Sequence, residues 1–186
     1  MISRSLAAPL FALALAGCLS TQDEPFPLTG GDAVAARPGD YACRTFDPKG
    51  AAKAERGRLI PLQRNGQTQY VFVTPDDSSA EPATLHRVAD GTYLIAVAHS
   101  GGPGEDFYLA AIAGAGASFR LYAPADAALA AAPALAAKIG ATLVHNTFGD
   151  DLSGPVDAQR AFALAFAGDL KNWRLAADCL AGPKRP

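Results

Sequence analysis

Charge is scarce in this chain, and the charges it has nearly cancel. Only 18% of the 186 residues are charged, and the formal net charge is −2. Nucleic-acid phosphates are bound by concentrated Lys/Arg surfaces. The one tight basic cluster, Lys53, Arg56 and Arg58, has Glu55 inside it. The sequence therefore argues against nucleic acid as a partner.

Motifs of metal and catalytic chemistry are also missing. The three histidines, His86, His99 and His145, are far apart and show no His-x-x-x-His spacing. There is no Cys-x-x-Cys, so neither a zinc ribbon nor a thioredoxin-like redox site is supported. The chain has neither a Gly-Lys-Ser/Thr phosphate loop nor a Gly-x-Ser-x-Gly hydrolase elbow. We therefore expect no metal, no cofactor and no catalytic residue, and we favour a non-enzymatic protein.

The amino-terminal residues have the pattern of a secretory signal. Arg4 is followed by an apolar stretch from Leu6 to Leu15, interrupted only by Pro9, and small residues then lead to Cys18. A membrane span needs about 20 apolar residues, so this stretch is too short to be a transmembrane helix. Residues 1–17 are predicted to be a cleaved signal peptide.

The tetrad Leu15-Ala16-Gly17-Cys18 resembles the lipobox of bacterial lipoproteins. The resemblance implies cleavage before Cys18, lipidation of its thiol, and acylation of the new amino terminus by a fatty acid such as palmitate. Two or more acyl chains anchor a protein stably where one does not. Leu19 stands where enterobacterial lipoproteins retained at the inner membrane have Asp, so the resemblance favours the outer membrane, facing the periplasm. An ordinary signal peptide with an incidental cysteine is the alternative.

Two cysteines, Cys43 and Cys179, remain besides Cys18. Beyond the inner membrane the compartment is oxidising, and an isolated pair of cysteines there usually forms a disulfide. We expect a Cys43–Cys179 bridge that joins the first predicted strand to the C-terminal region. Two buried free thiols, or a catalytic cysteine, are the alternatives.

The domain organisation follows from shifts in residue pattern. Residues 18–38 comprise the lipidated cysteine and a predicted flexible tether, because Leu19 to Pro38 shows no periodicity. Residues 39–181 predict a single α+β domain, and residues 182–186 a tail. Within the domain, residues 39–124 alternate short β-prone runs with turns such as Asp90-Gly91, which predicts an antiparallel β-meander or small barrel.

Residues 125–181 are predicted to be mainly helical and to cover the meander. The stretch from Asp126 to Ile139 is rich in alanine, which favours helix. A final short helix is predicted through Leu170, Trp173, Ala177 and Leu180 because their spacing fits one helical face. A strand through Trp173 to Leu175 is the alternative.

The most unusual local stretch is a glycine-rich run between two predicted strands. The candidates for a binding loop are His99, Ser100, Gly101, Gly102, Gly104 and Glu105. The same residues also fit a mobile hairpin loop with a solvated acidic edge. His99, Ser100 and Asp106 include the residue types of a catalytic triad. Most aromatic residues should lie in the core, but a binding surface would result if Tyr70, Tyr108 and Tyr122 lined one exposed face.

Two family resemblances extend beyond the lipobox. The tether, Gly39-Asp40-Tyr41-Ala42-Cys43 at the start of the meander, and a helix begun by Leu152-Ser153 resemble small proteobacterial lipoproteins of unknown activity. Tyr41-Ala42-Cys43 and Ser100-Gly101 are similar to the Cys-bearing strand and the inhibitory loop of lipoprotein inhibitors of lysozyme. Gly102-Pro103 stands where that family has an Ala-Arg pair.

The sequence thus leads to three hypotheses. The favoured one is a membrane-anchored envelope lipoprotein that acts as a non-enzymatic binding or structural module, with an envelope protein or a glycan as partner. The second is a periplasmic lysozyme-type inhibitor. The third is a hydrolase centred on the His99-Ser100 loop.

Overall fold

The structure of the protein is a computed structural model. It describes residues 19–26, 36–64, 67–75, 81–99, 104–146 and 149–182. The predicted signal peptide and Cys18 lie outside these residues, as does most of the predicted tail.

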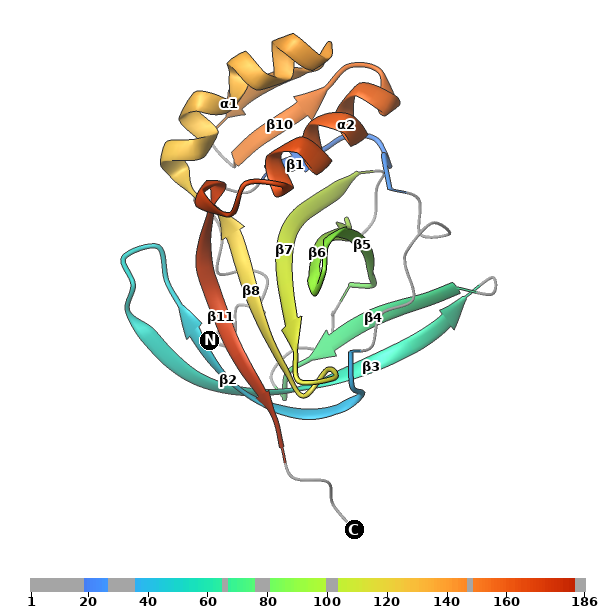
Figure 1. Cartoon of the computed structure of the whole chain (residues 1–186), viewed down its shortest axis with the longest axis vertical. Coiled ribbons are helices and arrows are strands. Elements are labelled where there is room, and N and C mark those ends of the chain that lie inside the picture. Colours follow the sequence, from blue (N-terminus) through green and yellow to red (C-terminus); the bar gives the residue numbers. More distant parts are fainter. Residues whose placement is uncertain are drawn as a thin grey trace, which may run out of the picture.

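The described residues form a closed antiparallel barrel of eight strands (Figure 1). Seven consecutive strands make a meander, and an eighth strand from the end of the chain pairs with both the first and the last of them. These two pairings of the eighth strand close the ring. The strands are β2 (Gly39–Phe46), β3 (Ala52–Arg64), β4 (Gln67–Val73), β5 (Ala83–Ala89), β6 (Thr92–Ala98), β7 (Glu105–Ala113), β8 (Ser118–Pro124) and β11 (Trp173–Ala181). The predicted meander over residues 39–124 and the small barrel are confirmed.

Local sequence accounts for these hairpins. In β2, Tyr41, Cys43 and Thr45 are buried, while the residues between them are exposed, which is the period-two pattern of a strand with one inward face. The β5–β6 hairpin turns at Asp90-Gly91, where Gly91 has a φ of +69° that glycine adopts without strain.

The C-terminal region differs from its prediction. Residues 125–181 were predicted to be mainly helical, but the described part of this range contains only two α-helices, α1 (Asp126–Ile139) and α2 (Val156–Ala167), and one 3₁₀ turn, η2 (Leu170–Asn172). Trp173–Ala181, predicted as the last helix, is strand β11. A register shift between Leu175 and Ala177 breaks its alternation, which hid the strand pattern. The fold is therefore mostly β, with small helices.

The predicted tether is also partly wrong. Leu19–Thr21 form strand β1, which pairs in parallel with β10 (Gly149–Ser153) and antiparallel with β7. Strand β9 (Thr142–Asn146) pairs with β10, so β1, β10 and β9 extend the barrel sheet beyond β7. The folded unit thus includes residues 19–26 rather than beginning at residue 39.

Two separate apolar regions hold the fold together. At one end, α1 and α2 pack over the β1–β10–β9 extension, with a core that includes Leu19, Phe107 and Phe162 (Figure 1). Inside the barrel, a second group of apolar side chains projects from the strands. The helices therefore close one end of the molecule, and the barrel interior forms its own core.

Candidate functional site

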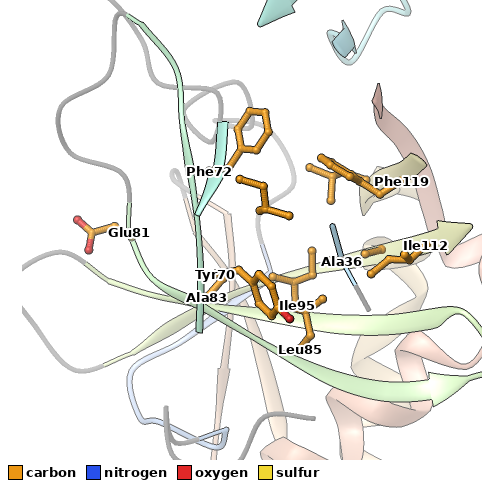
Figure 2. A pocket seen from close by; sticks show the side chains of 12 residues that line it. Ala36, Tyr70, Phe72, Glu81, Ala83, Leu85, Ile95, Ile112 and Phe119 are labelled. Carbon is orange, nitrogen blue, oxygen red and sulfur yellow. The ribbon is translucent and has the colours of Figure 1, made fainter. Parts of the chain in front are cut away.

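The barrel interior contains an apolar cavity that is partly open to solvent. Its volume is about 60 Å³. The side chains around it come from six strands, from the segment before β2 and from the segment just before β5. They are those of Ala36, Leu59, Tyr70, Phe72, Glu81, Ala83, Leu85, Ile95, Ala110, Ile112, Phe119 and Leu121. In Figure 2 the apolar side chains lie around a common space, whereas Glu81 stands apart with its carboxylate directed away from them.

Strand alternation explains why these residues share the interior. Tyr70 and Phe72 are two positions apart on β4, and Ala110 and Ile112 are two positions apart on β7. Every second residue of a barrel strand points inward. Ala83 and Ala110 place only a methyl group where their neighbours place larger side chains, and this leaves the space unfilled.

The barrel wall is tightly packed beside the cavity. A side chain at Gly57 on β3 would collide with the ring of Phe72. Phe72 in turn packs edge-on against Phe119, with ring centroids 6.0 Å apart. The cavity is therefore bounded by side chains that have little room to move.

Two of the three tyrosines proposed for an exposed surface are inside the protein instead. Tyr70 is only 6% exposed and lines the cavity, and Tyr108 is 7% exposed. The alternative of an exposed face made by Tyr70, Tyr108 and Tyr122 is therefore wrong, and Tyr70 and Tyr108 lie in the core, as expected for most aromatic residues. Side chains alternate between the two faces of a strand, and Tyr70 and Tyr108 fall on the buried faces of β4 and β7.

The predicted disulfide is confirmed. Cys43 on β2 and Cys179 on β11 are directly opposite in register, with Cα atoms 4.1 Å apart. Both side chains are buried. The bridge joins the first and last barrel strands across 136 positions of sequence.

The glycine-rich loop is described only at its two ends. Ser100, Gly101 and Gly102 lie outside the described residues. His99 is half-buried, and its Nε2 is 3.2 Å from Asp106 Oδ1. Gly104 has a φ of +120°, and a Cβ there would lie 2.6 Å from His99 Nδ1.

The structure pairs His99 with Asp106, and no serine hydroxyl of the described residues, which exclude Ser100, is joined to that pair. The serine opposite Asp106 in register is Ser20 of β1. Its hydroxyl donates a 2.6 Å hydrogen bond to Asp151 Oδ1. Burial raises the pKa of the Asp106 carboxyl, and the neighbouring His99 opposes that rise. The described residues thus form a polar cluster on this face of β1.

Glu105 does not lie at a solvated loop edge. Its side chain is 1% exposed and accepts a 3.0 Å hydrogen bond from the backbone N–H of Phe26. Burial raises the pKa of this carboxyl to about 8, which the hydrogen bond from Phe26 only partly offsets. Glu105 therefore holds the N-terminal segment against the sheet and is not part of an exposed binding loop.

Two other kinds of site were sought among the described residues. No group of three His, Cys, Asp or Glu side chains in that part of the chain could hold a metal ion. No helix there is both long enough and apolar enough to cross a membrane.

Comparison with protein-family models, with curated protein sequences and with solved structures gave no match.

Proposed function

We propose that this protein is a lipid-anchored envelope lipoprotein whose barrel binds a small apolar group in its interior. The single observation that carries the binding role is the apolar cavity. Barrels of eight strands have interiors just wide enough to be filled by side chains or to hold one small ligand. A well-formed apolar pocket is the default location for such a ligand.

The lining favours hydrocarbon over a glycan. Ten of the twelve lining residues carry no polar side-chain group, and of the other two, Glu81 turns its carboxylate away from the apolar side chains (Figure 2). A sugar hydroxyl that loses water without gaining a hydrogen bond costs about 1–3 kcal/mol. A methylene group that leaves water gains about 0.8 kcal/mol.

The volume sets the size of the ligand. The cavity measures about 60 Å³, and a water-sized group needs about 10–15 Å³ of such space. About four carbon-sized groups therefore fit, which corresponds to a short stretch of acyl chain. Four buried methylenes supply about 3 kcal/mol.

The anchor is supported by the sequence. Leu15-Ala16-Gly17-Cys18 has the small residues and the cysteine of a lipobox at the expected distance after an apolar stretch. The Cys43–Cys179 disulfide fits an oxidising compartment such as the periplasm. The outer membrane remains the favoured location because Leu19, not Asp, follows Cys18.

The binding role is tested with a series of straight-chain alcohols. A chain that begins at Leu19, the first residue of β1, is titrated with ethanol to octanol by calorimetry. Each added methylene should raise affinity about fourfold until the cavity is full, and longer alcohols should gain no more. Binding should also show a negative heat-capacity change.

Matched variants locate the site. Ala110→Leu fills the cavity and should lower affinity at least tenfold. Ala54→Leu makes the same change at an exposed position of β3 and should leave affinity unchanged. Absence of binding by every alcohol, or equal affinity in both variants, would contradict the proposal.

A further inference from the structure

The first half of β3 forms an open edge of the barrel sheet. Residues 52–57 pair on one side with β2, and β4 joins the other side of β3 only from Arg58 onward. In the part of the chain that the structure describes, no strand pairs with residues 52–57 on that other side. All of these residues except Glu55 and Gly57 are exposed, and Figure 1 shows the β2–β3 hairpin standing out from the barrel. An open strand edge can accept a further strand.

The hydrogen-bond ladder determines which backbone groups face the open side. At the turn between β2 and β3, the N–H of Asp47 donates to the carbonyl oxygen of Ala51 at 3.0 Å. The hydroxyl of Thr45 donates to the carbonyl oxygen of Lys53 at 3.3 Å, so this carbonyl also faces β2. Successive residues of an antiparallel pair alternate in direction, and the β2–β3 register is continuous. The residues whose N–H and C=O groups face the open side are therefore Ala52, Ala54 and Arg56.

The side chains along this edge carry one charge of each sign. Lys53 and Glu55 lie on the same face of β3, with Lys53 Nζ 2.8 Å from Glu55 Oε1. Ala54, between them in sequence, carries only a methyl group. Charged side chains are one means by which edge strands avoid pairing, because like charges repel. An edge with both signs can pair with a copy of itself when each charge meets its opposite.

A single register meets this condition. Two copies related by a two-fold axis pair antiparallel about one central residue. The outward backbone groups meet one another when that residue is 53, 54 or 55, whereas a centre at 52 or 56 carries the pairing into the turn or into β4. A centre at Lys53 or at Glu55 places that residue opposite its own copy, so that like charges face each other. A centre at Ala54 instead places Lys53 opposite Glu55 of the second copy.

We propose that the open edge of β3 pairs with the same edge of a second copy of this chain, antiparallel and centred on Ala54. Ala54 then exchanges backbone hydrogen bonds with its own copy, and Ala52 exchanges them with Arg56 on either side. Lys53 and Glu55 meet at non-hydrogen-bonded positions, where Cα atoms are about 4.5 Å apart and side chains are closest. The paired residues 52–56 lie within the open run, so β4 need not move. The pairing requires neither the lipid anchor nor a ligand in the cavity.

Thiol crosslinking in cells tests the pairing and its register. Five residues from each copy make a small interface, and a covalent link captures a weak complex. Opposite residues of a hydrogen-bonded pair have Cα atoms about 5.5 Å apart. Ala54→Cys in the full chain should therefore give a covalent dimer with a short bifunctional thiol reagent.

Ala52→Cys is the matched control on the same face of the same strand. The two copies of residue 52 would be offset by about 13 Å along the strands, beyond the reach of the reagent. The unsubstituted chain reports any crosslinking through its own cysteines. Covalent dimer should form with Ala54→Cys and stay at the background level with Ala52→Cys.

Charge exchange tests whether the partner is a second copy. Lys53→Glu places Glu opposite Glu, and Glu55→Lys places Lys opposite Lys. Added to Ala54→Cys, each change should lower the yield of covalent dimer at least about fivefold. The double exchange should restore the yield. Coexpression of the two single variants should restore it as well, as a mixed dimer identified by tags of different size.

Each of these results has a contrary outcome. Absence of covalent dimer with Ala54→Cys, or an equal yield with Ala52→Cys, would overturn the proposal. A yield that does not respond to the single charge changes would also overturn it, as would failure of both the double exchange and the coexpressed pair to restore the dimer. Equal amounts of each variant, measured by immunoblot, exclude loss of the protein as the cause of a lower yield.

Discussion

Glu105→Gln offers a quantitative test of how the N-terminal segment is held. The carboxyl is 1% exposed and accepts a hydrogen bond from the N–H of Phe26. Glutamine has nearly the same shape, and its amide oxygen can accept the same bond. The substitution therefore removes the ability to ionise while keeping the contact.

The magnitude follows from the pKa of the folded protein. Burial raises the pKa of Glu105 from 4.5 to about 8. In the unfolded chain the carboxyl ionises above 4.5, whereas in the folded protein it stays protonated until about pH 8. The stabilising effect of the neutral form is fully present below pH 4.5 and is lost as pH rises to 8, at about 1.4 kcal/mol per pH unit. The loss is about 3 kcal/mol by pH 7 and about 4 kcal/mol by pH 8.

The assay is urea unfolding of wild type and Glu105→Gln at a series of pH values. The difference in free energy of unfolding, variant minus wild type, should rise between pH 4.5 and 8. The neighbouring Asp106 carboxyl, whose pKa burial also raises, is present in both proteins, so its contribution largely cancels in the difference.

A fixed offset from the extra amide donors of glutamine, about 1–3 kcal/mol, does not change the slope. Glu55→Gln, at a partly exposed position beside Lys53, serves as the matched control for the same change of side chain. A flat difference for Glu105→Gln would refute the account of a neutral, buried Glu105.

Three further substitutions test the packing. Phe26→Ala leaves a buried site empty and should lower the free energy of unfolding in denaturant titrations by about 3–5 kcal/mol. A loss below about 1 kcal/mol would show that residues 19–26 are not packed against the domain. Cys43→Ala with Cys179→Ala should cost up to about 5 kcal/mol by the loop-entropy relation, whereas equal unfolding midpoints with and without the bridge would contradict a structural role. Gly104→Ala should lower the free energy of unfolding by about 2 kcal/mol or more, because residue 104 has a φ of +120° and the new Cβ would collide with the His99 ring. Unchanged thermal stability would contradict this backbone geometry.

Local sequence patterns were sufficient to predict the meander. Alternating burial in β2 and the Asp90-Gly91 turn are short-range signals, and each acts within a single hairpin. Strand β11 could not be predicted in the same way. Its Ala and Leu content favours helix, and its place is set by pairing with β2 across 136 positions and by the bulge between Leu175 and Ala177. Because β11 closes the barrel, its tertiary contacts override the helix propensity of its sequence.

The candidate site could be predicted from sequence only in part. The cysteine count, together with the expectation of an oxidising compartment, was sufficient to predict the Cys43–Cys179 pair. The cavity gave no such signal, because it depends on Ala83 and Ala110 meeting larger side chains across the barrel. The packing of residues 19–26 against the rest of the protein was also not predicted. Asp23 is a residue typical of linkers, and its role becomes visible only when Gln159 lies beside it.

Binding in the barrel cavity is the central claim, and isoleucine methyl NMR tests it most directly. Ile95 and Ile112 line the cavity, whereas Ile60 on β3 and Ile139 on α1 do not. With δ1-methyl labelling of the chain that begins at Leu19, saturating octanol should shift the signals of Ile95 and Ile112 and leave those of Ile60 and Ile139 in place. Unmoved cavity methyls, or equal shifts at all four residues, would contradict binding inside the barrel.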